Sequence, residues 1–320
     1  MNLDVIGQLE DELEEDGLNY DLWSKLIQQV LAKDKEEQVR SVMNKYLSIF
    51  KFDGEQWCNY INYEMSRGEF GSVQELFKKC LGDTTSVPLF RLYVSYVRRV
   101  NDVITGGDKA RGTVIQAFEF AVKRVGIDLN SFDLWEDYIE FLKSWTPAQT
   151  WEQQQKVDLI RKTYKKVLQI PSDKLEKLWA VYTVWENDIN PGTAKKFIGE
   201  KSADYMLARS WYTEWSNITK RSLKKDVFIP FNLFDENESH KELLRSQLNL
   251  WFSWIELEKK NKLELKDDAL VQQRIEYAYR QALSKIPFSP DLWFYFTKFW
   301  LSANEEANLN KCIDILNEGL

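Results

Sequence analysis

Large aromatic residues recur along the chain at the spacing of a helical repeat. They open seven amphipathic segments and lie 33 to 45 residues apart, except for one interval of 72. These residues are Trp23, Trp57, Phe90, Trp135, Trp179, Trp251 and Trp293. A repeat of this length predicts stacked helix pairs, in which each unit buries its apolar face against its neighbours.

Each segment has the hydrophobic pattern of a helix. A second aromatic stands three residues after the first, and in some units an acid stands seven after it. The second aromatics are Tyr60, Tyr93, Tyr138, Tyr182, Trp254 and Phe296, and the acids are Glu64, Glu186 and Glu258. Positions i, i+3 and i+7 share one helix face, so we expect the rings to fill the space between paired helices. We expect each acid to accept a hydrogen bond from an indole, a tyrosine hydroxyl or a backbone group.

A second helix is predicted to follow each first helix. The candidates are residues 36–50, 72–81, 110–125, 156–168, 193–200 and 272–283. In the third of these, Val114, Phe118, Ala121 and Val122 have the spacing of one buried helix face. Prolines 88, 171 and 287 stand where helices must begin or end.

The interval of 72 residues predicts a domain boundary. It holds a further long helix at 201–221 and then a polar stretch at 222–242 with a proline, asparagines and acids. A loop of that length is unusual inside a compact domain. We therefore expect an N-terminal array at 1–222, a linker at 223–242 and the start of a second array at 243–320. Since a solenoid end normally carries a polar cap, we expect the natural protein to be longer than this chain.

These helix pairs resemble the HAT (half-a-tetratricopeptide) repeat. Residues 122–145 and 175–215 in particular resemble the HAT-repeat subunit of cleavage stimulation factor, whose yeast counterpart belongs to cleavage factor IA. In that family too, a long helix and a break separate the N-terminal from the C-terminal HAT domain. The chain departs from the repeat pattern at Phe90 and Trp254, and the acid is missing from units one, three, four and seven.

The resemblance implies an all-α, right-handed α-solenoid that serves as a nuclear scaffold in pre-mRNA 3′-end cleavage and polyadenylation and is not an enzyme. It implies homodimerisation through the C-terminal HAT domain and contacts with other cleavage and polyadenylation factors. It also implies binding of an RNA-recognition subunit through a region beyond this chain, so that contact with pre-mRNA is mostly indirect. The alternative is a HAT-repeat scaffold of splicing or ribosome biogenesis.

Charge argues against a free-standing nucleic-acid-binding protein. The chain has 43 basic and 50 acidic residues and a net charge of −7, so direct RNA binding would need a local basic groove. The basic clusters are Arg98–Arg99, Lys165–Lys166, Lys195–Lys196 and residues 220–225, which we interpret as solvated helix ends and loops. The acidic run at 10–16 is interpreted as a solvated or partner-seeking N-terminus. No apolar stretch is long enough to predict a membrane span.

The sequence predicts no catalytic, cofactor-binding or metal-binding residues. His240 is the single histidine and stands in a polar stretch that predicts a solvated loop. Gly107 and Gly112 have the spacing of a phosphate loop, but Thr113 stands where that motif requires lysine, so we expect a turn between two helices. The cysteines lack zinc-ligand spacing.

Two tryptophans outside the repeat pattern are candidates for partner docking. Trp145 and Trp151 flank the predicted loop at 146–150 of unit four. An exposed aromatic pair can anchor a protein partner. The alternative is that they pack against the adjoining helix.

Overall fold

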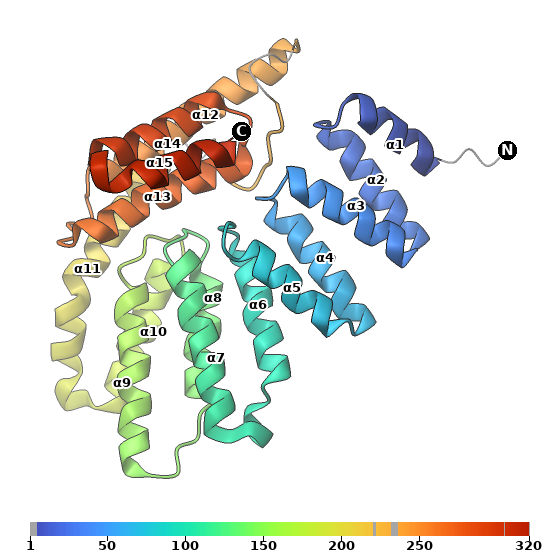
Figure 1. Ribbon diagram of the computed structural model, residues 1–320. Helices are drawn as coiled ribbons and strands as arrows, with labels where there is room; N and C mark the ends of the chain where they lie inside the picture. Colours follow the sequence, from blue (N-terminus) through green and yellow to red (C-terminus); the bar gives the residue numbers. More distant parts are fainter. Residues whose placement is uncertain (1–4, 220–221, 232–235, 304, 320) are drawn as a thin grey trace. The chain divides into compact units, whose positions relative to one another are not determined.

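The computed structural model describes residues 5–219, 222–231, 236–303 and 305–319, and the regular structure in these residues is helical (Figure 1). The helices are α1 (Val5–Glu15), α2 (Tyr20–Lys33), α3 (Glu36–Ile49), α4 (Gly54–Arg67), α5 (Phe70–Cys80), α6 (Val87–Val100), α7 (Val103–Val125), α8 (Phe132–Lys143), α9 (Thr150–Val167), α10 (Leu175–Ile189), α11 (Pro191–Ile218), α12 (Glu238–Lys259), α13 (Asp268–Lys285), α14 (Pro290–Ala303) and α15 (Glu305–Gly319). The all-α class predicted from the sequence is confirmed for these residues.

Local sequence explains where the helices begin and end. Before α2, the side chain of Asn19 accepts a hydrogen bond from the backbone N–H of Leu22 at 3.2 Å. Before α4, the carboxylate of Asp53 accepts two such bonds from the first turn. These caps satisfy donors that the helix itself leaves unpaired. Gly68 ends α4 in the left-handed conformation, with φ of 78°, which favours glycine.

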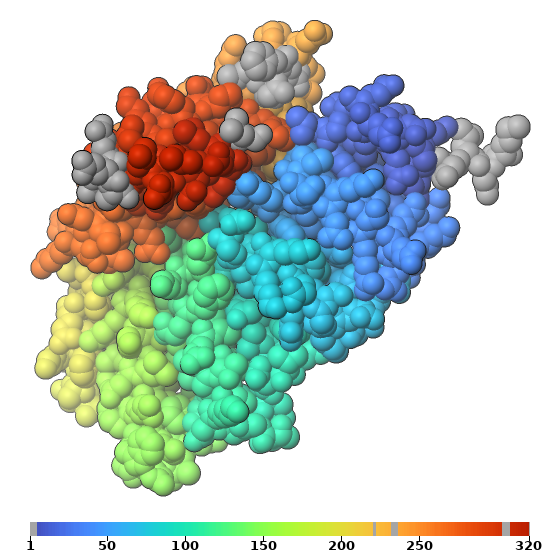
Figure 2. Space-filling model, in the orientation of Figure 1, coloured from blue at the N-terminus to red at the C-terminus, as the bar shows by residue number. Residues whose placement is uncertain are grey.

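Helices that are consecutive in sequence pack side by side. The packed neighbours include α2 with α3, α4 with α5, α6 with α7, α8 with α9, α10 with α11 and α14 with α15. On α7, the predicted apolar face at Val114, Phe118, Ala121 and Val122 is buried, as expected. Phe118 stacks on Tyr138 of α8, with ring centroids 4.8 Å apart. Side chains close the spaces between the ribbons of α7, α8 and α9 (Figure 2, green).

The chain divides into two compact units. The first unit comprises residues 1–85, 224–249 and 279–320, and the second comprises residues 86–223 and 250–278. Each unit therefore combines residues from both sides of the linker predicted at 223–242. The division into successive arrays at 1–222 and 243–320 stays a prediction.

Two boundaries inside the second unit differ from the predicted ones. The helices expected at 193–200 and 201–221 are one helix, α11, as far as Ile218, because Pro191 and the capping Asn190 start it and no further proline follows in the helix; residues 220–221 lie outside the described part of the chain. The turn expected around Gly107 lies earlier, at Asn101 and Asp102. Gly107 instead interrupts α7 with φ of 56° and ψ of −141°, a kink that glycine adopts readily.

The structure also places two features of the first unit in helices, which the sequence did not predict. The acidic run at 10–16 lies largely within α1, whose Ile6, Leu9 and Leu13 are buried on one side. The acidic side chains of the run are exposed, as expected for a solvated N-terminus, and most of them lie on an amphipathic helix. His240 lies in the first turn of α12, half-buried rather than in a solvated loop, because its ring stacks on Phe231 with centroids 3.6 Å apart.

Candidate protein-interaction site

Four of the opening tryptophans are hydrogen-bonded to the backbone that precedes their helix. The indole Nε1 atoms of Trp23, Trp57 and Trp293 each donate to the backbone carbonyl six residues earlier, at 2.8 Å. Trp135 makes the equivalent bond to the carbonyl of Gly126 at 2.9 Å. A buried indole thus has its single donor satisfied while its ring packs in the core.

The second aromatics lie between paired helices. Tyr60, Tyr138, Tyr182, Trp254 and Phe296 are buried, whereas Tyr93 is half-buried. The Tyr138 hydroxyl donates to Glu119 on α7 at 2.9 Å. Burial, reinforced by the Glu119 carboxylate, raises the pKa of Tyr138 above its ordinary value. The ring is therefore a neutral core side chain.

The three acids of the pattern are buried, and each binds an arginine. Glu64, Glu186 and Glu258 are 0 %, 1 % and 5 % exposed. Each accepts two hydrogen bonds of 2.7 to 2.9 Å from one guanidinium, and the donors are Arg40 on α3, Arg161 on α9 and Arg274 on α13. Such bidentate pairing is the strongest hydrogen bonding available to a carboxylate from a protein side chain.

Sequence reasoning missed these arginines. It expected indole, hydroxyl or backbone donors, and such a donor accompanies the arginine at Glu258, where Trp254 Nε1 donates at 3.1 Å. Arg40 and Arg161 precede their acids by 24 and 25 residues, whereas Arg274 follows Glu258 by 16. A fixed spacing therefore does not find them. The available signal was an arginine on the predicted second helices at 36–50, 156–168 and 272–283.

The candidate docking tryptophans have different surroundings. Trp151 opens α9 with 61 % of its surface exposed, and its indole N–H donates to Gln149. Trp145 is half-buried, and the guanidinium of Arg111 lies 4.0 Å from its ring centroid. The structure thus does not present them as an exposed pair, and Trp151 alone offers most of its ring to a partner.

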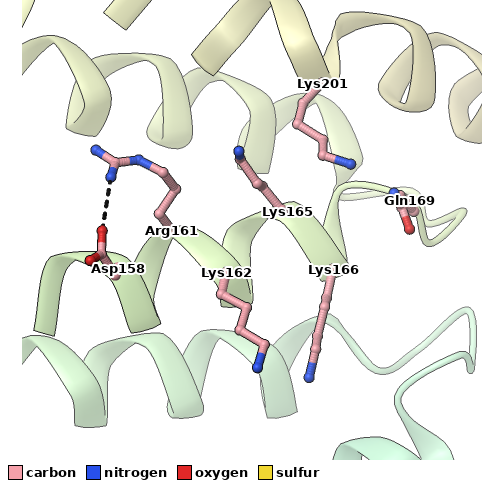
Figure 3. A pocket seen from close by; sticks show the side chains of 7 residues that line it. All are labelled: Asp158, Arg161, Lys162, Lys165, Lys166, Gln169 and Lys201. Carbon is pink, nitrogen blue, oxygen red and sulfur yellow. Dashed lines mark hydrogen bonds and ion pairs between the residues drawn. The ribbon is translucent and has the colours of Figure 1, made fainter. Parts of the chain in front are cut away.

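A basic cavity of about 390 Å³ lies along α9 and α11. It is lined by Asp158, Arg161, Lys162, Lys165, Lys166, Gln169 and Lys201. Figure 3 shows Arg161 and Lys165 pointing toward the α11 side, whereas Lys162 and Lys166 point to the opposite side of α9. From the sequence alone, Lys165–Lys166 are expected only to form a solvated helix end.

Most cations of this cavity have an acidic neighbour. Lys165 pairs with Glu200 at 3.0 Å, Lys166 with Glu119 at 3.0 Å and Lys201 with Asp204 at 2.5 Å. The hydrogen bond from Lys165 holds the pKa of Glu200 below its ordinary value. Lys162 is exposed and forms no ion pair with any residue that the structure describes. In the basic cluster predicted at 220–225, residues 220 and 221 lie outside the described part of the chain.

Within the described ranges, no three histidine, cysteine, aspartate or glutamate side chains are grouped so that they could hold a metal ion. None of the helices of the described chain combines the length and apolar character needed to cross a bilayer.

Comparison with known proteins identifies the family. The family model described as Suppressor of forked protein (Suf) matches residues 4–320. The chain belongs to this family. Several proteins similar to this Suf chain bear the name mRNA 3′-end-processing protein RNA14. The one from Debaryomyces hansenii is 64 % identical over all of this chain and 42 % of its own length.

Other relatives bear the same name. The Candida albicans protein is 54 % identical over 100 % of the Suf chain and 39 % of its own length. The Saccharomyces cerevisiae protein is 35 % identical over 94 % of the Suf chain and 46 % of its own length. The Suf chain therefore spans less than half the length of these relatives.

Among solved structures, the crystal structure of CstF-77 has a similar fold. Its TM-score to the Suf chain is 0.63 at 17 % sequence identity, over 83 % of this chain and 51 % of that one. At this identity the likeness concerns the fold. The HAT-repeat, helix-pair architecture inferred from the aromatic pattern agrees with it.

Proposed function

We propose that the Suf chain is part of a scaffold subunit of the nuclear pre-mRNA 3′-end cleavage and polyadenylation machinery, where it binds proteins and does not catalyse. The observation that carries this proposal is its 64 % identity, over its whole length, to a protein named for mRNA 3′-end processing. Helix-pair repeats suit such a role because their stacked surfaces can hold several partners. Binding factors together raises their effective concentration.

The chemistry of the interior supports a binding role. Glu64, Glu186 and Glu258 are each held by a guanidinium, so these buried carboxylates are engaged in packing rather than in proton transfer. The ring of His240 is stacked on Phe231, and burial raises the pKa of the Cys80 thiol to about 12, which suppresses its nucleophilic thiolate.

The proposed partners are proteins of the same machinery. We propose contacts with other cleavage and polyadenylation factors, homodimerisation through the C-terminal HAT domain of the full-length protein and association with an RNA-recognition subunit. Within this chain, Trp151 is the aromatic proposed to dock a partner, because its ring is largely exposed at the start of α9. Trp145 is proposed to support the loop under Arg111 rather than to dock.

Affinity purification of the full-length protein from nuclear extract, followed by mass spectrometry, tests the proposal. Recovery of cleavage and polyadenylation factors together with an RNA-recognition protein is the expected result, with the tag alone as the control. Recovery of spliceosomal or pre-ribosomal proteins in their place would leave the fold intact and overturn the function.

A further inference from the structure

On the basis of the scaffold function above, we propose that the basic cavity of α9 and α11 binds a phosphorylated serine or threonine side chain of a protein partner. The cavity is wide open to solvent, and the side chains of five cationic residues line it. Clusters of basic side chains recognise phosphorylated segments, most often through arginine, and lysine also binds phosphate, as a point charge.

The cations are arranged in two rows along α9. Arg161 and Lys165 form one row, and Lys162 and Lys166 form the other, each at i and i+4 (Figure 3). Side chains at this spacing are neighbours on a helix surface. Lys201 adds a cation from α11. Because the two rows point to opposite sides of α9, an anion at this surface is met by the charged ends of one row at a time, and Lys162 and Lys166 form the more exposed row.

Not all five cations are equally free to bind. The guanidinium of Arg161 is fixed by the buried carboxylate of Glu186. Lys165 and Lys166 pair with Glu200 and Glu119, whose side chains are about as exposed as the lysines or more so. Exposed pairs of this kind contribute little and exchange readily with other anions. Lys162 is exposed and has no ion-pair partner among the described residues, so Lys162 and Lys166, which point to the same side of α9, are the donors most available to an anion.

The surrounding acids favour a phosphate monoester over other anions. A carboxylate carries one charge and offers no more than the glutamates that it would displace. A phosphorylated side chain carries a charge of about −1.5 to −2 and three acceptor oxygens, so it competes with them. This distinguishes it from acidic peptides.

The same surroundings disfavour RNA. The described lining of the cavity includes no aromatic side chain on which bases could stack. Asp158, Glu119 and Glu200 beside the cations repel the remainder of a polyanion, and the whole chain carries a net charge of −7. A single phosphorylated residue avoids both obstacles.

Fluorescence anisotropy with the 320-residue chain tests the site. The probe is a fluorescein-labelled glycine–serine heptapeptide with one central phosphoserine, compared with its unphosphorylated form and with a form that has glutamate at that position. We expect the phosphopeptide to bind at least about tenfold more tightly than either comparison peptide, because only it is a dianion. The double variant Lys162→Ala/Lys166→Ala should lose about tenfold in affinity for the phosphopeptide, corresponding to two lost donors.

The matched control is Lys78→Ala/Lys79→Ala on α5, which removes the same charge from the first unit and should leave binding unchanged. Circular dichroism melts establish that both variants fold, and the single change Lys162→Glu, at an exposed position, provides a second test. Equal binding of the three peptides, or equal effects of the two double variants, would overturn the site. A labelled twelve-residue oligouridylate that binds more tightly than the phosphopeptide, and loses binding in Lys162→Ala/Lys166→Ala, would assign the cavity to RNA and also overturn it.

The outcome is separable from that of the scaffold function. Loss of peptide binding with normal co-purification of 3′-end factors would refute the phosphate site alone. Phosphopeptide binding together with recovery of spliceosomal proteins would refute the proposed function and leave the site in place.

Discussion

Arg161 and Lys162 are consecutive residues of α9, yet one belongs to the interior and the other to the surface. The guanidinium of Arg161 reaches the buried carboxylate of Glu186 at 2.8 and 2.9 Å. The exposed side chain of Lys162 lines an open cavity. One step along a helix turns a side chain by about 100°, so neighbours in sequence face different surroundings. Position on the helix, rather than charge, therefore decides whether a cation stabilises the fold or is available to a partner.

Trp135 and Trp151 show the same contrast among aromatics. Trp135 is 3 % exposed and its indole is bonded to the Gly126 carbonyl, whereas Trp151 is 61 % exposed. The repeat position of Trp135 places it between helices. Trp151 lies outside that pattern, at the start of α9.

The largest expected effect on stability distinguishes Arg161 from Lys162. Arg161→Ala should lower the free energy of unfolding by about 3–5 kcal/mol, because it leaves Glu186 buried without its partner. Lys162→Ala, one residue away, should change it by less than about 0.5 kcal/mol. Urea unfolding of the two variants measures both. Similar losses for the two would mean that Arg161 does not act as an interior residue.

The second prediction compares two tryptophans of the repeat pattern. Trp135→Ala should cost about 3–5 kcal/mol, as for a fully buried aromatic. Trp179 is only half-buried against Tyr205, so Trp179→Ala should cost about 2 kcal/mol. Thermal melts followed by circular dichroism rank the two. A melt unchanged by Trp135→Ala would show that the stripe does not face the core.

A third, smaller effect concerns alkaline pH. The pKa of Tyr138 is raised in the folded chain by burial and by Glu119, while an unfolded tyrosine titrates near 10. Its contribution to stability is therefore fully present below about pH 10 and is lost as the pH rises toward the folded-state value. Between pH 9 and 11 this amounts to about 1 kcal/mol.

Tyr138→Phe is the matched variant for that measurement, because it keeps the ring and removes the titrating group. Unfolding free energies at pH 9 and 11 should differ less in Tyr138→Phe than in the parent chain. The same pH dependence in both proteins would assign the alkaline loss to other groups.

The smallest effect on stability is expected at the exposed tryptophan. Trp151→Ala should change the free energy of unfolding by less than about 0.5 kcal/mol. If Trp151 docks a partner, the full-length variant should nevertheless recover less of at least one co-purifying factor than the parent. Undiminished recovery of every factor would remove Trp151 from the interaction surface.

Much of the fold could be predicted because the aromatic repeat is a local signal. Trp, a second ring three residues on and the following helix all follow from helical periodicity. The pairs of Glu64 with Arg40 and of Glu258 with Arg274 could not, because they join helices with different spacing and opposite order along the chain. The basic cavity was likewise hidden, since it needs Lys201 of α11 beside the lysines of α9. The kink at Gly107 was not predicted, because the glycines around it suggested a turn between two helices instead.

We have proposed that the full-length protein supports 3′-end processing by binding and not by catalysis. A pre-mRNA 3′-end cleavage assay in nuclear extract depleted of the full-length protein tests it most directly. We predict that depletion abolishes cleavage, that adding back the purified protein restores it and that the purified protein alone leaves the RNA intact. Cleavage by the purified protein alone, or undiminished cleavage in the depleted extract, would contradict the claim.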